Sequence, residues 1–172
     1  LMRLMEMQRQ AMQMYTSCGW FFDEISGIET LQILQYALRA INFAQQVSRR
    51  DLLPAFLHRL EEAPSNVMSD GAEVLREKVL PARVDLERMG MHLAASSVFE
   101  EYPEQLDLFI YHARSLEFRR LKGGSFRLAM GRTLVRSQIT LSEKRFSFVV
   151  LHLRQQHLIG HIARQLGEEE YA

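Results

Sequence analysis

The 172-residue chain has a single cysteine, Cys18, no long apolar run and no excess of charge of either sign. One cysteine excludes an intrachain disulfide and is typical of a reducing compartment, so we expect a cytoplasmic protein. Without an apolar run of about 18 residues, an integral membrane helix is excluded. Basic and acidic residues number 21 each, which argues against a nucleic-acid-binding protein because such proteins normally carry a basic excess.

Motifs for binding metals and phosphates are also missing. Gly123-Gly124 and Gly131 are typical of turns or bulges, and no phosphate-binding loop surrounds them. His152, His157 and His161 lie on neighbouring expected strands, where two histidines would begin a metal site, but no carboxylate or cysteine completes the spacing. We therefore expect neither a metal nor a cofactor and interpret these histidines as satisfied or exposed side chains.

The chain does contain enough apolar residues, 47%, for a sizeable core. Up to Pro103 their spacing is helical and predicts five helices, over residues 1–15, 27–47, 50–62, 71–79 and 81–99. Ser26 and Glu29 have the spacing of a capping box, which starts the second helix at Gly27. Pro81 suits the first turn of the fifth.

After Pro103 apolar residues alternate with a period of two, which predicts strands around residues 108–113, 126–130, 146–150 and 157–163. Turns are indicated at residues 122–124, 141–144 and 154–156. The fold class is therefore α+β, with an N-terminal bundle of about five helices (1–105) followed by an antiparallel β-meander of at least four strands (106–172). We expect the two subdomains to form one compact unit, cut from a longer chain.

The two predicted subdomains differ in charge. Residues 1–105 carry 10 basic and 15 acidic residues, whereas residues 106–172 carry 11 and 6. Opposite charges suggest that the helices and the sheet dock on each other. Five arginines could line one face of the sheet and bind an anion there, although docking on the acidic helices is the more economical interpretation: Arg119, Arg120, Arg127, Arg132 and Arg136.

The loop between the first two helices has the most distinctive composition. Trp20, Phe21 and Phe22 are consecutive, and one short loop cannot bury all three rings, so we expect at least one to be displayed. Asp23 follows at once. An aromatic ring beside a carboxylate suits a sugar, because the ring stacks on the C–H face and the carboxylate accepts from hydroxyls. Alternatively, the rings plug the end of the bundle and Asp23 caps a turn.

Polar residues recur at spacings of three and four along the second expected helix, so they share one face. They are mainly amides, which both donate and accept hydrogen bonds. If this face lined a cleft, Gln35 and Arg39 would be candidates for contacts with sugar hydroxyls; plain solvent exposure is the simpler interpretation. The stripe consists of Gln32, Gln35, Arg39, Asn42 and Gln46.

Hydrolysis of a glycosidic bond needs two carboxyl groups that face each other, roughly 5–10 Å apart. The adjacent pairs Glu61-Glu62 and Glu100-Glu101 do not face each other on a helix and are interpreted as solvated surface. Asp23 is the one credible contributor, and it lacks a partner. We therefore expect no complete catalytic site in this chain.

Residues 14–30, MYTSCGWFFDEISGIET, and residues 32–37, QILQYA, closely resemble a segment of domain of unknown function 3536. The resemblance continues through residues 96–104, SSVFEEYPE, and 148–152, FVVLH, and so covers most of the chain. The family's region follows the catalytic domain in bacterial and archaeal proteins assigned to glycoside hydrolase family 57. Residues 154–157 depart from the Gly-Asp-His-Asn-like turn expected after His152.

Family 57 enzymes are retaining glycosidases or transglycosylases of α-glucans, with their catalytic carboxylates in a (β/α)7 barrel. This chain lacks the βαβ alternation of a barrel, so the resemblance implies an accessory C-terminal domain. Such a domain would pack on an upstream catalytic barrel of the same polypeptide and help to shape its cleft. By that analogy, Trp20, Phe21 and Asp23 would contact an α-glucan. The alternative is a structural or oligomerisation module without a ligand.

Overall fold

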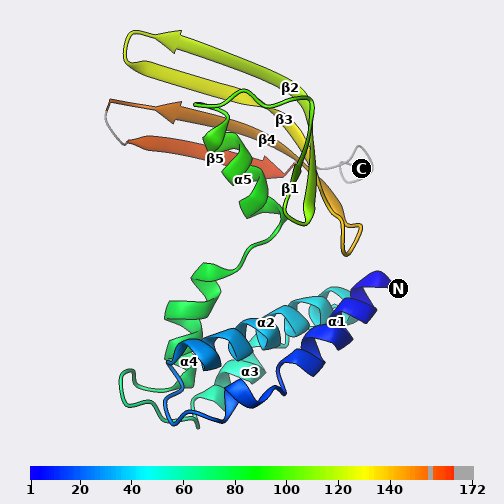
Figure 1. The fold of residues 1–172 in the computed structure, drawn as a ribbon, viewed down its shortest axis with the longest axis vertical. Helices are drawn as coiled ribbons and strands as arrows, with labels where there is room; N and C mark the ends of the chain where they lie inside the picture. Colours follow the sequence, from blue (N-terminus) through cyan, green and yellow to red (C-terminus); the bar gives the residue numbers. More distant parts are fainter. Residues whose placement is uncertain (155–156, 165–172) are drawn as a thin grey trace. The chain divides into compact units, whose positions relative to one another are not determined.

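The structure is a computed structural model that describes residues 1–154 and 157–164. This part of the chain forms five α-helices followed by a five-stranded antiparallel sheet, which confirms the predicted α+β class (Figure 1). The chain divides into two compact units, Leu1–Arg83 and Val84–Ala172. Among the described residues, no helix is both long and apolar enough to cross a membrane.

The first unit contains four of the helices. They are α1 (Met2–Gln13), α2 (Ile28–Ser48), α3 (Leu53–Leu60) and α4 (Gly71–Val74), and α4 continues as a π-helical turn (Leu75–Val79) and a 3-10 turn (Leu80–Ala82). The apolar residues of α2, α3 and the α4 region meet in one core, whose buried members are Leu34, Leu38, Val74, Leu75 and Val79. The first four helices thus form close to where the sequence predicts them.

The predicted fifth helix begins later than expected. Pro81 lies in the 3-10 turn, and the chain is extended at Arg83. Helix α5 (Leu86–Ser96) starts after Asp85, whose carboxylate accepts from the backbone N–H of Arg88 at 2.9 Å. An aspartate with its side chain on the N–H three residues ahead is a strong N-cap, so Asp85 rather than Pro81 marks the start of this helix.

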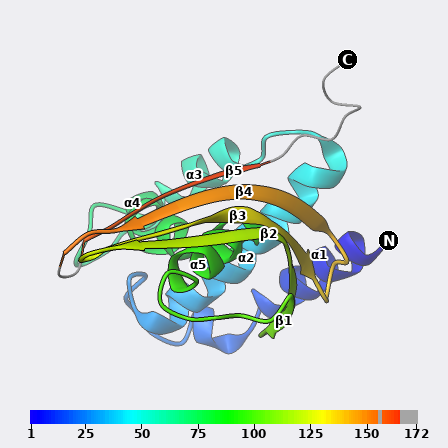
Figure 2. The same cartoon turned by 90° about the horizontal axis from the view of Figure 1, so that it is seen from above.

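The second unit contains α5 and the sheet. The strands are β1 (Gln105–Leu108), β2 (Tyr111–Gly123), β3 (Phe126–Ser137), β4 (Glu143–His152) and β5 (Leu158–Arg164), each antiparallel to its sequence neighbour. Helix α5 covers one face of the sheet (Figure 2). Close packing there depends on Gly90, because a Cβ at this position would lie 2.9 Å from Ile162 Cδ1.

The boundary between the units therefore differs from the predicted one at residue 105. Residues 84–105 carry five acidic residues and one basic residue, and they belong to the sheet's unit. Arg120 of β2 donates to the backbone oxygen of Ser97 at the end of α5, at 2.7 Å, and pairs with Glu101 at 3.5 Å. Within the second unit, an acidic segment thus contacts the basic sheet.

The strand predicted at residues 108–113 is two strands joined by a tight turn. Strand β1 ends at Leu108 and β2 begins at Tyr111. Between them Phe109 has φ 54°, in the left-handed region that bulky residues rarely adopt. By contrast, Gly124 has φ +58° in the turn predicted at residues 122–124, and that hairpin forms. The turn predicted at residues 154–156 includes residues 155 and 156, which lie outside the described residues.

The expectation that five arginines line one face of the sheet is wrong. Successive side chains of a strand point to opposite faces. Arg120 is opposite Ala129, and Arg127 shares the same face of β3 as Ala129, which packs against the α5 segment. The remaining three lie on the opposite face: Arg119, Arg132 and Arg136.

We predict that Gly131→Ala destabilises the second unit. Strand β2 has a bulge between Ser115 and Glu117, and a Cβ at Gly131 would lie 2.2 Å from the Glu117 backbone oxygen. Because backbone must move to admit the methyl group, the expected loss is about 1–3 kcal/mol. Urea unfolding followed by circular dichroism measures it. Gly123→Ala is the control, since no atom lies within 4 Å of its Cβ position; equal losses in the two variants would contradict this account.

Candidate functional site

The aromatic loop between α1 and α2 displays its side chains to solvent. Trp20 is 74% exposed, Phe21 69% and Phe22 51%, so the prediction that at least one ring is displayed is confirmed and the alternative of a bundle plug is wrong. Phe21 and Phe22 pack edge to face, with ring centroids 5.0 Å apart. Asp23 is exposed beside them. The loop therefore presents an aromatic surface next to a carboxylate.

Glu24 fixes the end of this loop. Its Oε1 accepts from the Ser65 hydroxyl at 2.6 Å and from the Ser26 N–H at 2.8 Å, and its Oε2 accepts from the Asn66 N–H at 2.7 Å. These hydrogen bonds, that of Ser65 first, lower the pKa of Glu24 to about 2. A carboxylate that the sequence analysis passed over thus ties the loop to the segment that precedes α4.

The same carboxylate replaces the predicted capping box. Helix α2 begins at Ile28 with Gly27 as its N-cap, and no side chain caps it. In the predicted capping box, the backbone N–H of Ser26 donates to the side chain of Glu29. In the structure, this N–H donates to the carboxylate of Glu24 instead. The predicted capping box is therefore wrong, because the carboxylate of Glu24 already accepts the hydrogen bond from this N–H.

The polar stripe of α2 is divided between solvent and α1. Gln35 is exposed, whereas Arg39 is half-buried and its positive charge helps to lower the pKa of Glu6 on α1. Among the described residues, no hydrogen bond or ring contact joins Gln35 or Arg39 to the aromatic loop. The structure therefore does not gather these two residues with Trp20, Phe21 and Asp23 into one contact cluster.

Helix α1 packs with its polar side inward. Glu6 is 6% exposed and Gln10 2%. Glu6 accepts from Gln10 Nε2 at 2.7 Å and from both Nε and Nη2 of Arg9, at 2.8 and 2.6 Å. These bonds, that of Arg9 foremost, lower the pKa of Glu6 although burial opposes the shift. A hydrogen-bonded carboxylate thus occupies the position where a helix normally buries an apolar side chain.

The opposite side of α1 leaves large apolar residues uncovered. They recur near one face of the helix, as the sequence spacing predicts, but this face is exposed. We call this set the outer face of α1: Leu1 at 91% exposure, Leu4 at 42%, Met5 at 59%, Met12 at 75% and Tyr15 at 79%. Large apolar side chains exposed on one helix face are typical of interaction sites.

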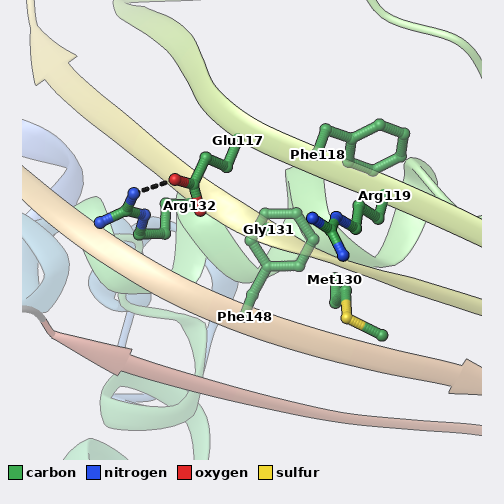
Figure 3. A pocket seen from close by; sticks show the side chains of 7 residues that line it. All are labelled: Glu117, Phe118, Arg119, Met130, Gly131, Arg132 and Phe148. Carbon is green, nitrogen blue, oxygen red and sulfur yellow. Dashed lines mark hydrogen bonds and ion pairs between the residues drawn. The ribbon is translucent and has the colours of Figure 1, made fainter.

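A pocket of about 540 Å³ lies in the second unit, around Gly131 (Figure 3). Phe118, Gly131 and Phe148 share one cross-strand row, and the two rings, 6.5 Å apart, flank the position where glycine has no side chain. Glu117 pairs with Arg132 in the next row. Alternation along the strands places the rings and the ion pair on opposite faces of the sheet, so they do not converge on one ligand. The remaining lining residues are Arg119 and Met130.

The histidines singled out in the sequence do not form a cluster. His152 is opposite Arg127 on the face that α5 covers, whereas His161 is opposite Val149 on the other face. Among the described residues, no group of three or more histidine, cysteine, aspartate or glutamate side chains could hold a metal ion. The alternation of strand side chains thus separates two residues that sequence proximity brought together.

We predict that Glu24→Gln lowers the melting temperature of the first unit at neutral pH. We also expect the melting temperature of this variant to fall less steeply than that of the wild type as the pH is lowered. The folded-state pKa of about 2 lies below the ordinary 4.5. The carboxylate therefore stabilises the fold fully above about pH 4.5 and loses this contribution as the pH falls toward 2. Thermal unfolding between pH 2 and 7 measures the effect. Asp23→Asn, an exposed neighbour, is the control, and parallel pH profiles for wild type and Glu24→Gln would contradict the assignment.

Comparison with known proteins gives one match. The family model described as "Domain of unknown function (DUF3536)" matches residues 1–172, the full length of the chain. Searches of the curated proteins and of the solved structures found no significant match. Since the family model matches the whole chain, across both units, the chain belongs to the DUF3536 family.

Proposed function

We propose that this chain is an accessory C-terminal domain of a cytoplasmic, family 57-like glycoside hydrolase or transglycosylase that acts on α-glucans. In this role it packs on an upstream catalytic barrel of the same polypeptide and helps to shape the substrate cleft. It supplies no catalytic pair of its own. The supporting resemblance is at the level of the family, and the structural support comes from two surfaces of the first unit.

The outer face of α1 is the observation that carries this proposal. A helix that buries Glu6 and Gln10 while it exposes Met5, Met12 and Tyr15 leaves its apolar surface for another body. For such a face to pack on a catalytic barrel, the helices that surround the barrel would have to present apolar side chains outward. The outer face of α1 is therefore the surface by which we expect the chain to dock.

The aromatic loop supports the second part of the proposal. Trp20, Phe21 and Asp23 follow α1 in the chain and are exposed. Glu24 holds the end of the loop through three hydrogen bonds, so the loop is preorganised, which reduces the entropy cost of binding. Docked beside the mouth of the barrel, it would offer an indole to a sugar's C–H face and a carboxylate to its hydroxyls.

The chemistry of catalysis is left to the barrel. A glycosidase needs two carboxyl groups on either side of the scissile bond, and the pocket around Gly131 has one, Glu117, which is paired with Arg132. The alternative function is a structural or oligomerisation module without a ligand. It shares the docking face with the first proposal and differs in giving Trp20 and Asp23 no part in activity.

Trp20→Ala in the polypeptide that carries both the barrel and this domain is expected to lower kcat/KM on a maltooligosaccharide roughly tenfold, a loss of about 1.4 kcal/mol of transition-state binding. Phe109→Ala is the matched control, because Phe109 is an exposed aromatic residue of the other unit. Unchanged kinetics in Trp20→Ala would remove the sugar contact and favour the structural module.

Docking through α1 is tested separately by cysteine labelling. In a Cys18→Ser background, Met5→Cys is expected to react with a maleimide rapidly in the 172-residue chain and at least tenfold more slowly in the longer polypeptide, because the barrel covers it. Val67→Cys, exposed in the loop before α4, is expected to react equally in both. If Met5→Cys labels at the same rate in both proteins, α1 is not the docking surface.

A further inference from the structure

Strand β5 lies at one end of the sheet with an open edge. It pairs with β4 over its whole length, from Leu158 to Arg164. No strand within residues 1–154 and 157–164 pairs with its other edge. An open edge presents a row of backbone N–H and C=O groups, and the partner that satisfies such a row is another strand.

The opposite end of the sheet shows how an edge is normally protected. Strand β1 pairs with β2 only as far as Arg114, so within residues 1–154 and 157–164 no strand pairs with the outer edge of the rest of β2. That edge has a bulge at Ser115/Glu117 and carries Arg119, Arg120 and Lys122. Bulges and charged side chains are the devices by which proteins prevent edge pairing.

Strand β5 has none of these devices in its interior. Its sequence LIGHIAR has no proline and no lysine, its single arginine is the last residue, and its register with β4 has no bulge. Leu158 is 40% exposed and Ile159 60%. A regular, apolar and nearly uncharged edge strand of seven residues is a template for pairing with another chain.

We propose that β5 pairs with β5 of a second copy, antiparallel, to give a two-fold dimer with a continuous ten-stranded sheet. A strand paired antiparallel with its own copy is self-complementary about a two-fold axis, so no other partner is needed. Antiparallel pairing also continues the pattern of the sheet, in which each strand is antiparallel to its neighbour.

The proposal does not depend on the function proposed above. It uses the second unit alone, whereas the docking face and the aromatic loop belong to the first. A contact through one strand is smaller than a standard interface, so we expect a reversible dimer with a Kd in the micromolar range.

The sheet offers a matched pair of variants for the test. Leu121, Leu128, Leu151 and Ile159 form one cross-strand row on the face opposite α5. Leu121 on β2 and Ile159 on β5 stand at the two ends of this row and are 58% and 60% exposed. Ile159→Lys places a charge on the proposed contact strand, and Leu121→Lys makes the same kind of change at the other edge.

Sedimentation velocity of the 172-residue chain across a concentration series gives the Kd, with circular dichroism to verify folding. Ile159→Lys and, as a second variant of the same strand, His161→Lys are expected to raise the Kd at least tenfold, whereas Leu121→Lys changes it less than twofold. A wild type that stays monomeric at the highest concentrations overturns the proposal. The proposal is also overturned if Leu121→Lys and Ile159→Lys weaken the dimer equally, because that would indicate pairing through the sheet face. A dimer whose Kd changes in neither β5 variant overturns it as well.

Discussion

The hydrogen-bonded carboxylate of Glu6 determines which surface of the first unit is apolar. Arg9 and Gln10 satisfy both of its oxygens within one turn of α1, and the charge of Arg39 on α2 favours the ionised form. A buried charge without such partners would cost several kcal/mol. With these hydrogen-bond partners, the polar side of α1 is stable against α2, and its apolar side faces outward. The proposed docking and the proposed position of the aromatic loop both follow from this orientation of the helix.

In the second unit, the comparable constraint is the end of α5. Carbonyl groups at the end of a helix lack intrahelical partners and carry partial negative charge. Arg120 of β2 satisfies this end by donating to the carbonyls of Ser97 and Glu100. The acidic segment 84–105 therefore belongs with the basic sheet in one compact unit, which begins before α5.

The fold class and the exposed loop could be predicted because they depend on local signals. The apolar residues recur with a helical period in the first part of the sequence and with a period of two in the second part. Three consecutive aromatic residues cannot all be buried by a short loop. The turn at Phe109 could not be predicted, since a phenylalanine with positive φ is imposed by the pairing of β1 with β2. The face on which each arginine lies can be predicted only if the register between the strands is known. The bulge at Ser115/Glu117 changes the register between β2 and β3 in the middle of β2.

The orientation of α1 could not be predicted for a different reason. Its apolar residues recur near one face, and a helix of this pattern normally turns that face inward. A second pattern was present in the same helix, because Glu6, Arg9, Gln10 and Gln13 recur at spacings of three and four. Within that set Arg9 and Gln10 donate to Glu6, which lets the helix bury the carboxylate, whereas Gln10 Oε1 has no hydrogen-bond partner among the described residues.

These two patterns together argue that α1 is built for two partners. Rotating it by half a turn would bury Met5, Met12 and Tyr15 and release Glu6 to water, a change that hydrophobic transfer alone would favour. The observed orientation is stable only because Arg9, Gln10 and Arg39 offset the burial of Glu6. Covering the exposed apolar side of such a helix with another apolar surface would be favourable. The packing of α1 on α2 thus leaves the outer face of α1 uncovered within the first unit, and the docking proposal starts from this face.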